Sequence, residues 1–515
     1  MQCFMRNKIV YFNEASALFA RLRKEGRKIV QCHGTFDLLH PGHIVHFEEA
    51  KRLGDLLVVT VTAAKYVNKG PGRPFFNDEL RLRSIAALEN VDYVVLVPFP
   101  AAVEAIVCVR PHIYCKGKEY EQADADVTGN IRDDARMVKK LGGQIRYVGS
   151  VVFSSSKLLN VHFDTHNPGV KQFCRKVAEK FPFQKCRALT EDFQKLKVLV
   201  VGDIIFDRYT TTSVQGLTSK NRIISGRFIG EEIQAGGSLA VLRHIREFAP
   251  QVKLISLMGI EPWAEGALRK FVRPAEDHIL RVKGFATIVK QRFVEPQKEG
   301  KELPKLFAVN YIDALHPGAA VQKRIFERIY KEIKKYDLIV VMDFGHGVLG
   351  EAIREMVQDK APFLALNCQT NSNNHGFNII NRQYQRADSF SLDQTEIRLA
   401  FGRREINGLA DLNELRRQLK AKYGWLTRGD VETIGIKSNG TSSACPPFEV
   451  NIVDTVGAGD AFSAVASLAA VNGLPIELAT FMGQLAGSQA VKIVGNSEAI
   501  KKSVFLKGCE ALLNY

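Results

Sequence analysis

Short apolar runs alternate with amphipathic segments along the first third of the chain. The apolar runs predict strands at Lys28–Cys32, Leu56–Thr62, Tyr93–Pro98, Ile113–Cys115 and Gln144–Val148. The segments between them have helical spacing and predict helices at Ile44–Leu53, Asp78–Leu88, Ala101–Val109 and Ile131–Leu141. This alternation predicts a parallel doubly wound sheet, with its ligand at the carboxyl ends of the strands.

The same alternation returns near residue 196 and continues to the end of the chain. Apolar runs predict buried strands at Lys197–Asp203, Lys253–Met258, Leu338–Met342, Phe363–Asn367 and Thr433–Lys437. Thr210–Ile233 and Ala286–Ile312 alternate instead, which favours a small accessory sheet or lid over the main sheet. We therefore predict two α/β domains, at residues 1–160 and 196–515, each built on a doubly wound parallel sheet.

Residues 161–195 have a different pattern and are predicted to connect the two domains. The sequence His-Asn-Pro-Gly at 166–169 interrupts the alternation, and two short amphipathic helices are expected after it. Because Phe173, Val177 and Phe181 are apolar, we expect this connector to be packed.

Composition adds limits to this picture. A length of 515 residues exceeds one ordinary core, and no apolar run is long enough to span a bilayer. The nine cysteines are scattered without a C-x-x-C pair, which favours reduced thiols in the cytoplasm and argues against zinc. The net charge of +16 is dispersed among acidic residues, so we expect a surface that attracts nucleotides and sugar phosphates. Binding to nucleic acid or membrane is not expected.

The strongest motif in the first domain is the segment from His33 to His43, which follows the first predicted strand. A turn containing Gly34, Thr35 and Phe36 leads to His40 and His43, three residues apart at the start of a helix. Free backbone N–H groups and the helix dipole favour anions there, so the segment predicts a polyphosphate site. It resembles the nucleotidyltransferase signature of cytidylyltransferases and sugar-phosphate adenylyltransferases, which implies that both histidines stabilise the transition state.

Other residues of the first domain resemble the same family in their order along the chain. The resemblance implies nucleotide contacts for Arg81, Lys116 and the serines Ser154, Ser155 and Ser156. Taken singly, each has a simpler explanation, because basic residues are often only solvated and a serine cluster often only caps a helix. Lys69 is as readily explained by solvent exposure.

The strongest motif in the second domain runs from Asp454 to Phe462 and leads into an apolar helix. The small residues Gly457, Ala458 and Gly459 would let backbone N–H groups surround a phosphoryl group, and Asp460 would accept the proton of an attacking hydroxyl. The motif resembles the signature of ribokinase-like carbohydrate kinases.

Further positions support this second resemblance, although several could be plain turn residues. Lys290 and Arg292, two apart on a predicted strand, would point to one face and suit a phosphorylated sugar. By resemblance, Glu396 would be associated with a metal, and the acidic and glycine pairs would bind the sugar: Asp203, Asp207, Gly236 and Gly237.

Together the domains resemble the bifunctional heptose 7-phosphate kinases/heptose 1-phosphate adenylyltransferases of ADP-heptose synthesis, in reversed order. Ala240 and His346 depart from that family, which leaves the sugar open. The resemblance implies Mg²⁺, with ATP or CTP as nucleotide, and a sugar phosphate as substrate; a homodimer is an analogy. Two alternatives stay open: a polyol-phosphate cytidylyltransferase fused to another kinase, and a protein with one inactive, nucleotide-binding domain.

Overall fold

The computed structural model describes residues 8–67, 69–121, 130–150, 158, 167–298, 301–312, 317–370 and 374–514. The chain divides into two compact units, Met1–Lys171 with Leu506–Tyr515, and Gln172–Phe505. The domain limits inferred from sequence stay predictions. Among the described residues, no helix has the length and apolar character needed to cross a membrane.

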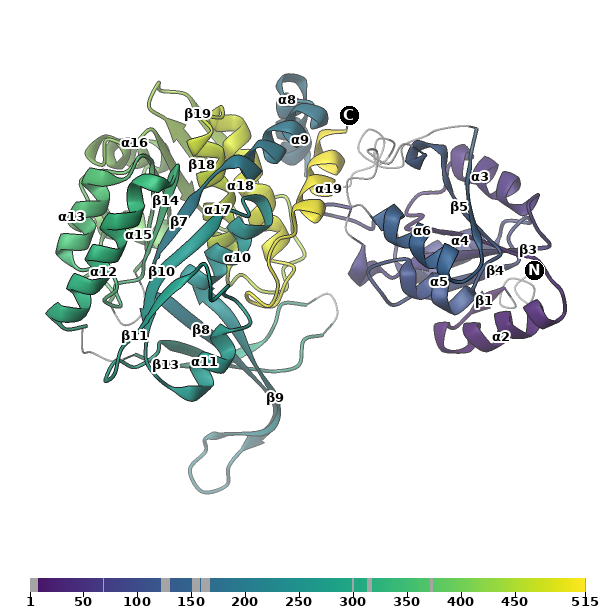
Figure 1. Cartoon of the computed structure of the whole chain (residues 1–515), viewed down its shortest axis with the longest axis horizontal. Helices are drawn as coiled ribbons and strands as arrows, with labels where there is room; N and C mark the ends of the chain where they lie inside the picture. Colours follow the sequence, from purple (N-terminus) through teal and green to yellow (C-terminus); the bar gives the residue numbers. More distant parts are fainter. Residues whose placement is uncertain are drawn as a thin grey trace. The chain divides into compact units, whose positions relative to one another are not determined.

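The first unit contains a parallel sheet with the strand order β1-β4-β3-β2-β5-β6 (Figure 1). Its strands are β1 (Ile9–Val10), β2 (Ile29–Gly34), β3 (Leu56–Thr62), β4 (Tyr93–Val97), β5 (Ile113–Gly117) and β6 (Gln144–Val148). Its helices are α2 (Phe12–Lys24), α3 (Pro41–Lys51), α4 (Asp78–Ala86), α5 (Val103–Val109) and α6 (Asn130–Lys140). The chain order reverses between β2 and β5, so a ligand is expected where these two strands end.

Apolar side chains cover both faces of this sheet. Phe47 of α3 and Ile85 of α4 pack in one cluster, whereas Phe19 of α2 and Val109 of α5 pack in another. The predicted doubly wound sheet is confirmed; β1 and α2 were not predicted.

The second unit is built on a sheet with the order β11-β10-β7-β14-β15-β16-β17-β18-β19. These strands are β7 (Val198–Gly202), β10 (Val252–Met258), β11 (His278–Arg281), β14 (Leu338–Asp343), β15 (Leu364–Cys368), β16 (Ser389–Asp393), β17 (Tyr423–Thr427), β18 (Thr433–Lys437) and β19 (Ser442–Cys445). The sheet is parallel from β11 to β17, and β18 and β19 are antiparallel additions.

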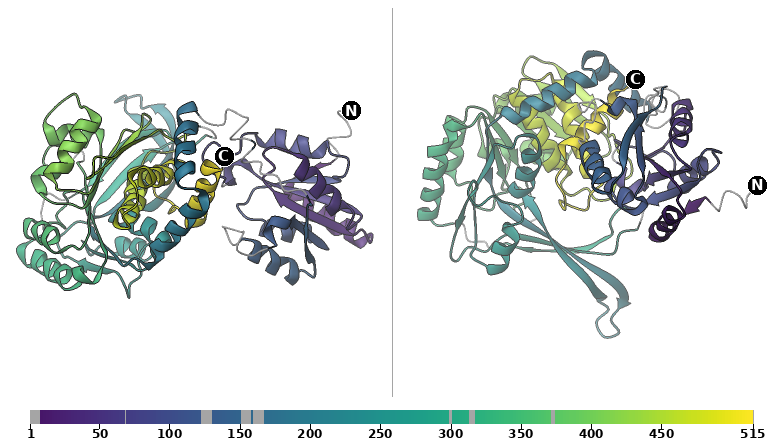
Figure 2. Two further views of the ribbon diagram at one scale, coloured as in Figure 1. Left: turned by 90° about the horizontal axis from the view of Figure 1, so that it is seen from above. Right: turned by 45° about the vertical axis from the view of Figure 1, so that its right-hand side comes forward.

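Helices cover both faces of this larger sheet (Figure 2). On one side lie α12 (Ala319–Glu332), α13 (Glu351–Lys360) and α16 (Gly408–Gln418). On the other lie α10 (Ser238–Phe248), α17 (Ala458–Val471) and α18 (Ile476–Ala490). The remaining helices are α8 (Pro168–Lys180), α9 (Phe183–Asp192), α11 (Pro262–Leu268), α14 (Ile380–Gln383), α15 (Gln394–Phe401) and α19 (Lys502–Leu513).

The accessory sheet predicted from the two alternating segments is confirmed. It contains β8 (Ile204–Leu217), β9 (Ile224–Gly237), β12 (Val289–Val294) and β13 (Lys305–Tyr311), in the order β13-β12-β8-β9. Its long β8–β9 hairpin extends away from the main sheet (Figure 1), and we call the four strands the lid. The two helices expected after residues 166–169 are α8, which begins at Pro168, and α9. Val177 of α8 and Phe181, between the two helices, are buried, and Phe173 is half-buried.

Candidate active sites

The turn after β2 brings His40 and His43 together. His40 is the N-cap of α3, and its Nδ1 accepts a hydrogen bond of 3.3 Å from the backbone N–H of His43. The two rings stack with centroids 3.8 Å apart. The helix begins at Pro41, earlier than the predicted Ile44, because proline is favoured in the first helical position. Both imidazoles therefore lie at a helix N-terminus.

His33 and His43 are neutral near pH 7. Burial lowers the pKa of His43 to about 3, and the neighbouring His40 adds to the effect. Burial, with a contribution from Lys116, likewise lowers the pKa of His33 to about 3. The ring of His33 contacts the hydroxyls of Thr60 and Thr62, at 3.0 and 3.2 Å. An anion bound beside these rings would raise their pKa values and favour donation of a proton or hydrogen bond.

Ring packing and buried hydrogen bonds fix the turn that is predicted to contact the nucleotide. Gly34 ends β2, and the ring of Phe36 packs against His43 and Phe47 with centroid distances of 5.3 and 5.2 Å. The guanidinium of Arg81 is buried and donates to the carbonyl oxygens of Thr35 and Thr62, at 2.6 and 2.9 Å. The structure thus places Arg81 under the turn, where it fixes the backbone of Thr35.

Lys116 lies at the end of β5, the strand next to β2 at the reversal point. Its Nζ is 3.5 Å from Asp134, whose carboxylate also accepts a hydrogen bond of 3.1 Å from Tyr114. Ser154, Ser155 and Ser156 lie outside the described residues. Gly149 and Ser150 precede them in the chain, and the backbone N–H groups of both donate hydrogen bonds to the carboxylate of Glu49.

In the second unit, the small-residue turn forms the N-terminus of α17. Gly457 is the N-cap with φ of 88°, and a Cβ there would collide with the side chain of Asn496. Asp460 lies in the first turn of the helix. The backbone N–H groups of this turn are therefore directed to the same region as the carboxylate of Asp460.

A cleft of about 600 Å³ contains most of the predicted kinase residues. Those that line it are Asp207, Gly237, Lys290, Arg292, Glu396, Gly457, Gly459 and Asp460. Of the other predicted residues, Ala458 belongs to the same turn, and Gly236 packs so closely on Asp207 that a Cβ would collide with its carboxylate.

The carboxyl of Asp460 in this cleft binds its proton more tightly than usual. Burial raises the pKa of Asp460 to about 7, Asp207 adds to the rise, and Lys290 opposes it. Burial also lowers the pKa of Lys290, although Asp207 opposes that change. A carboxyl that titrates near neutral pH is suited to general-base catalysis.

The lid supplies the basic residues of the cleft. Lys290 and Arg292 both lie on β12 and line the cleft together, as the spacing of two predicts. The guanidinium of Arg292 donates to Asp207 and lies 5.5 Å from the ring centre of Tyr209. Lys290 lies 5.5 Å from the ring centre of Phe344.

Asp203 lies outside this lining, although it was predicted to bind the sugar. Its carboxylate is completely buried and accepts backbone hydrogen bonds of 2.9, 3.2 and 3.2 Å from Phe344, His346 and Val348. Burial and the nearby Asp343 raise the pKa of Asp203 to about 7. The structure thus gives Asp203 a clear structural task, which is to fix the loop after β14.

Glu396 forms a capping box at the start of α15. Its carboxylate accepts backbone hydrogen bonds from Asp393 and Thr370, at 2.8 and 3.3 Å, and burial raises its pKa to about 8. Within the described ranges, no group of three or more His, Cys, Asp or Glu side chains could hold a metal ion. A Mg²⁺ here would therefore depend on nucleotide phosphates, since Mg²⁺ commonly uses only one or two carboxylates.

Sequence reasoning missed several residues of the cleft. Gln369 hydrogen-bonds the side chain of Asp460, and Asn367 and Thr370 lie beside it. These residues follow or end a predicted strand, and the carboxyl edge of a parallel sheet is where ligand contacts are expected. Arg428, Asp430 and Asn496 also line the cleft and carried no recognisable motif.

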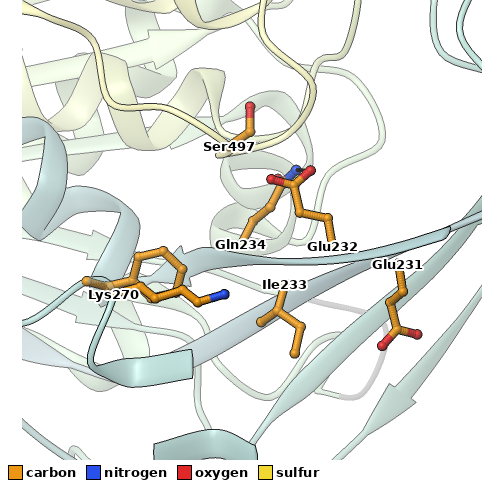
Figure 3. Close-up of a pocket in the computed structure, with 7 residues that line it drawn as sticks. Glu231, Glu232, Ile233, Gln234, Lys270 and Ser497 are labelled. Carbon is orange, nitrogen blue, oxygen red and sulfur yellow. Dashed lines mark hydrogen bonds between the residues drawn. The ribbon is translucent and has the colours of Figure 1, made fainter. Parts of the chain in front are cut away.

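A second hollow, of about 430 Å³, lies beside β9 (Figure 3). Glu232 and Gln234 project to one side of the strand, and Glu231 and Ile233 to the other. The amide of Gln234 donates to Glu232 and accepts from the backbone N–H of Asn496. No predicted site residue lines this hollow.

Two segments of the chain match models of known protein families. Residues 32–140 match the cytidylyltransferase-like family, and residues 373–502 match the pfkB family of carbohydrate kinases. The chain is 39% identical over 135 residues to "Bifunctional protein HldE" of Aliarcobacter butzleri, and 40% identical over 132 residues to that of Methylococcus capsulatus. These matches cover 26% and 25% of this chain, and 28% and 27% of the relatives. The matched region is thus under a third of the curated relatives' length.

Solved structures resemble the larger part of the chain. A ribokinase from Thermotoga maritima matches 61% of this chain and 99% of its own length, at 17% identity and a TM-score of 0.46. A carbohydrate kinase from Agrobacterium tumefaciens matches 60% of this chain and 95% of its own length, at 20% identity and a TM-score of 0.45.

Proposed function

We propose that this chain, which combines a cytidylyltransferase-like domain with a pfkB-family carbohydrate kinase domain, is a bifunctional enzyme that makes a nucleotide-activated sugar. The kinase domain phosphorylates a sugar or sugar phosphate from ATP. The N-terminal domain joins a sugar 1-phosphate to a nucleotide and releases pyrophosphate. The observation that carries the proposal is the cleft that Asp460 lines together with the lid cations and the glycine turn.

For the phosphoryl transfer, the carboxylate of Asp460 accepts the proton of the substrate hydroxyl. The resulting oxygen nucleophile forms a bond to the γ-phosphorus of ATP, and the bond to the β,γ-bridging oxygen breaks to release ADP. The backbone N–H groups at the N-terminus of α17 stabilise the negative charge of the transferred group. Mg²⁺, held by the nucleotide phosphates near Asp393 and Glu396, would neutralise part of this charge.

For the nucleotidyl transfer, no proton needs to be removed from the sugar 1-phosphate. One of its oxygens forms a bond to the α-phosphorus of the nucleotide, and the bond to the pyrophosphate oxygen breaks. His40 and His43 would align the phosphates and donate hydrogen bonds as charge develops on the leaving group. The close stacking of the two rings at the N-terminus of α3 supports this role.

The substrate is proposed to be a phosphorylated sugar, and the product to be ADP-heptose-like and destined for a surface glycan. Lys290 and Arg292 in the cleft support the phosphate on the sugar. A second candidate is a cytidylyltransferase of polyol phosphates, which the match of residues 32–140 favours. We place the enzyme in the cytoplasm, where ATP and sugar phosphates are available.

The experiment is a substrate screen with the purified full chain, in which ATP and CTP are each combined with sugars, sugar phosphates and polyol phosphates. Mass spectrometry of the products separates the candidates, because ADP-sugars and CDP-polyols differ in mass. Binding of ATP without any transfer would instead support an inactive, nucleotide-binding domain.

Exposed apolar side chains on the lid support a homodimer. Leu217, Phe228 and Phe307 are 63%, 62% and 52% exposed. Burying such residues against a second copy would be favourable. Light scattering of the Phe228→Ser variant tests this, and an unchanged mass would argue against a lid interface.

A further inference from the structure

Asp454 holds the phosphate-binding turn from inside the protein. Its side chain has no exposed surface, and its carboxylate accepts hydrogen bonds of 3.1 and 2.9 Å from the backbone N–H groups of Val456 and Gly495. A buried carboxylate is costly unless charged or polar groups compensate it. The position of the turn at 456–459 therefore depends on whatever neutralises Asp454.

Two further partners of Asp454 come from the lid. The hydroxyl of Tyr209, on β8, donates a hydrogen bond of 2.9 Å, and Nζ of Lys305, on β13, lies 2.7 Å from the other carboxylate oxygen. The backbone N–H of Leu303 also donates to the carbonyl of Val453, at 2.8 Å. Two lid residues, and Leu303 in the connection between β12 and β13, thus contact the chain at or immediately before the turn.

We infer that Lys305 is a positioning residue for phosphoryl transfer: its ammonium neutralises Asp454 and thereby fixes the turn that holds the phosphoryl group. This inference rests on the proposed kinase function. Lys305 acts through Asp454 and makes no contact with the reacting atoms. Tyr209 links Asp454 to the substrate cleft, because Arg292 of the cleft lies over the ring of Tyr209. Tyr209 thus contacts both a residue of the cleft and the carboxylate that fixes the turn.

The test compares Lys305→Ala with Lys220→Ala, a control on the same lid at the β8–β9 turn. Loss of the ammonium leaves Asp454 without a positive charge beside it, so we expect kcat for phosphorylation to fall about 100-fold, the effect of a small misplacement of catalytic groups. The KM for the sugar should change little. Added methylammonium supplies an ammonium in the vacated space and should restore most of kcat in Lys305→Ala only, and Lys305→Arg should retain activity.

Hydrogen exchange of a peptide covering residues 454–460 separates this inference from the proposed function. Exchange should be faster in Lys305→Ala and slow again with methylammonium, whether or not a substrate has been found. An inactive wild-type protein would refute the kinase proposal alone. Unchanged exchange, or an unchanged kcat in an active enzyme, would overturn the role of Lys305. If Lys305→Ala does not fold, Lys305→Gln is judged by the same criteria.

Discussion

The two proposed active sites place phosphate at a helix N-terminus but surround it with opposite chemistry. At α3 the neighbouring groups are imidazoles, and burial holds His33 and His43 neutral, with pKa values of about 3. At α17 the neighbours are carboxyls, and burial raises the pKa of Asp460 to about 7 and that of Glu396 to about 8. Both sites use the backbone N–H groups of a helix N-terminus, but the side chains around these groups differ.

This difference follows from what each reaction requires. A sugar phosphate already carries its nucleophilic oxygen, so nucleotidyl transfer needs donors that stabilise charge and no base. A sugar hydroxyl must lose a proton, so phosphoryl transfer needs a carboxylate whose pKa is near the working pH. The same helix terminus therefore supports two reactions because of the residues placed beside it.

The largest effect is expected from Asp460→Asn. Removing the base should lower the rate of phosphorylation by about 10³- to 10⁴-fold, the upper range for general acid–base catalysis. Nucleotidyl transfer, measured on the same protein with a supplied sugar 1-phosphate, should stay at the wild-type rate. Near-normal phosphorylation by this variant would remove Asp460 from the mechanism.

His43→Ala is the reciprocal test, with a somewhat smaller effect. Loss of one charge-stabilising donor should lower nucleotidyl transfer by about 10²- to 10³-fold, as removal of an oxyanion donor does elsewhere. Pyrophosphate release measures this step, and product sugar phosphate measures the unaffected kinase. A variant impaired in both reactions would show that the sites are not independent.

Continuous apolar runs in the sequence predicted buried strands correctly, whereas buried strands that contain polar residues or glycine were missed. The seven residues of β3 are all buried and were predicted with the observed limits. β16 and β17 were not predicted because neither is a continuous apolar run. Polar and apolar residues alternate in Ser389–Asp393, and Gly424 interrupts Tyr423–Thr427. The structure explains that glycine, since a Cβ at 424 would lie 2.7 Å from the ring of Phe390.

The site residues divide in the same way. The turns at His40 and Gly457 are local, so sequence alone located them. Asp203 binds backbone groups more than 140 residues away, and Arg81 binds a carbonyl 46 residues away. The sequence shows that such residues are charged, but it does not show that their side chains bind and fix a distant loop or turn.

A pH profile should separate the two sites without any mutation. The base form of Asp460 is lost as pH falls through about 7, so kcat/KM for phosphorylation should fall about tenfold per pH unit below that value. His43 stays neutral from pH 8 down to well below pH 5, so its titration should add no step to the pH profile of nucleotidyl transfer in that range, where the sugar phosphate itself titrates with a second pKa of about 6. A flat kinase profile would contradict the assignment of Asp460 as the base.

The smallest effect is expected from Arg292→Lys, which tests what the lid cations recognise. Lysine keeps the positive charge but loses the planar guanidinium that bonds Asp207 and stacks on Tyr209. We expect the KM for a phosphorylated sugar to rise about tenfold, the value of one charge-assisted hydrogen bond, with kcat and the KM for ATP nearly unchanged. Steady-state kinetics with a sugar phosphate and its unphosphorylated form measure this. If both forms lose affinity equally, Arg292 orients Asp207 and does not bind the phosphate, because only a phosphate contact depends on the phosphate's presence.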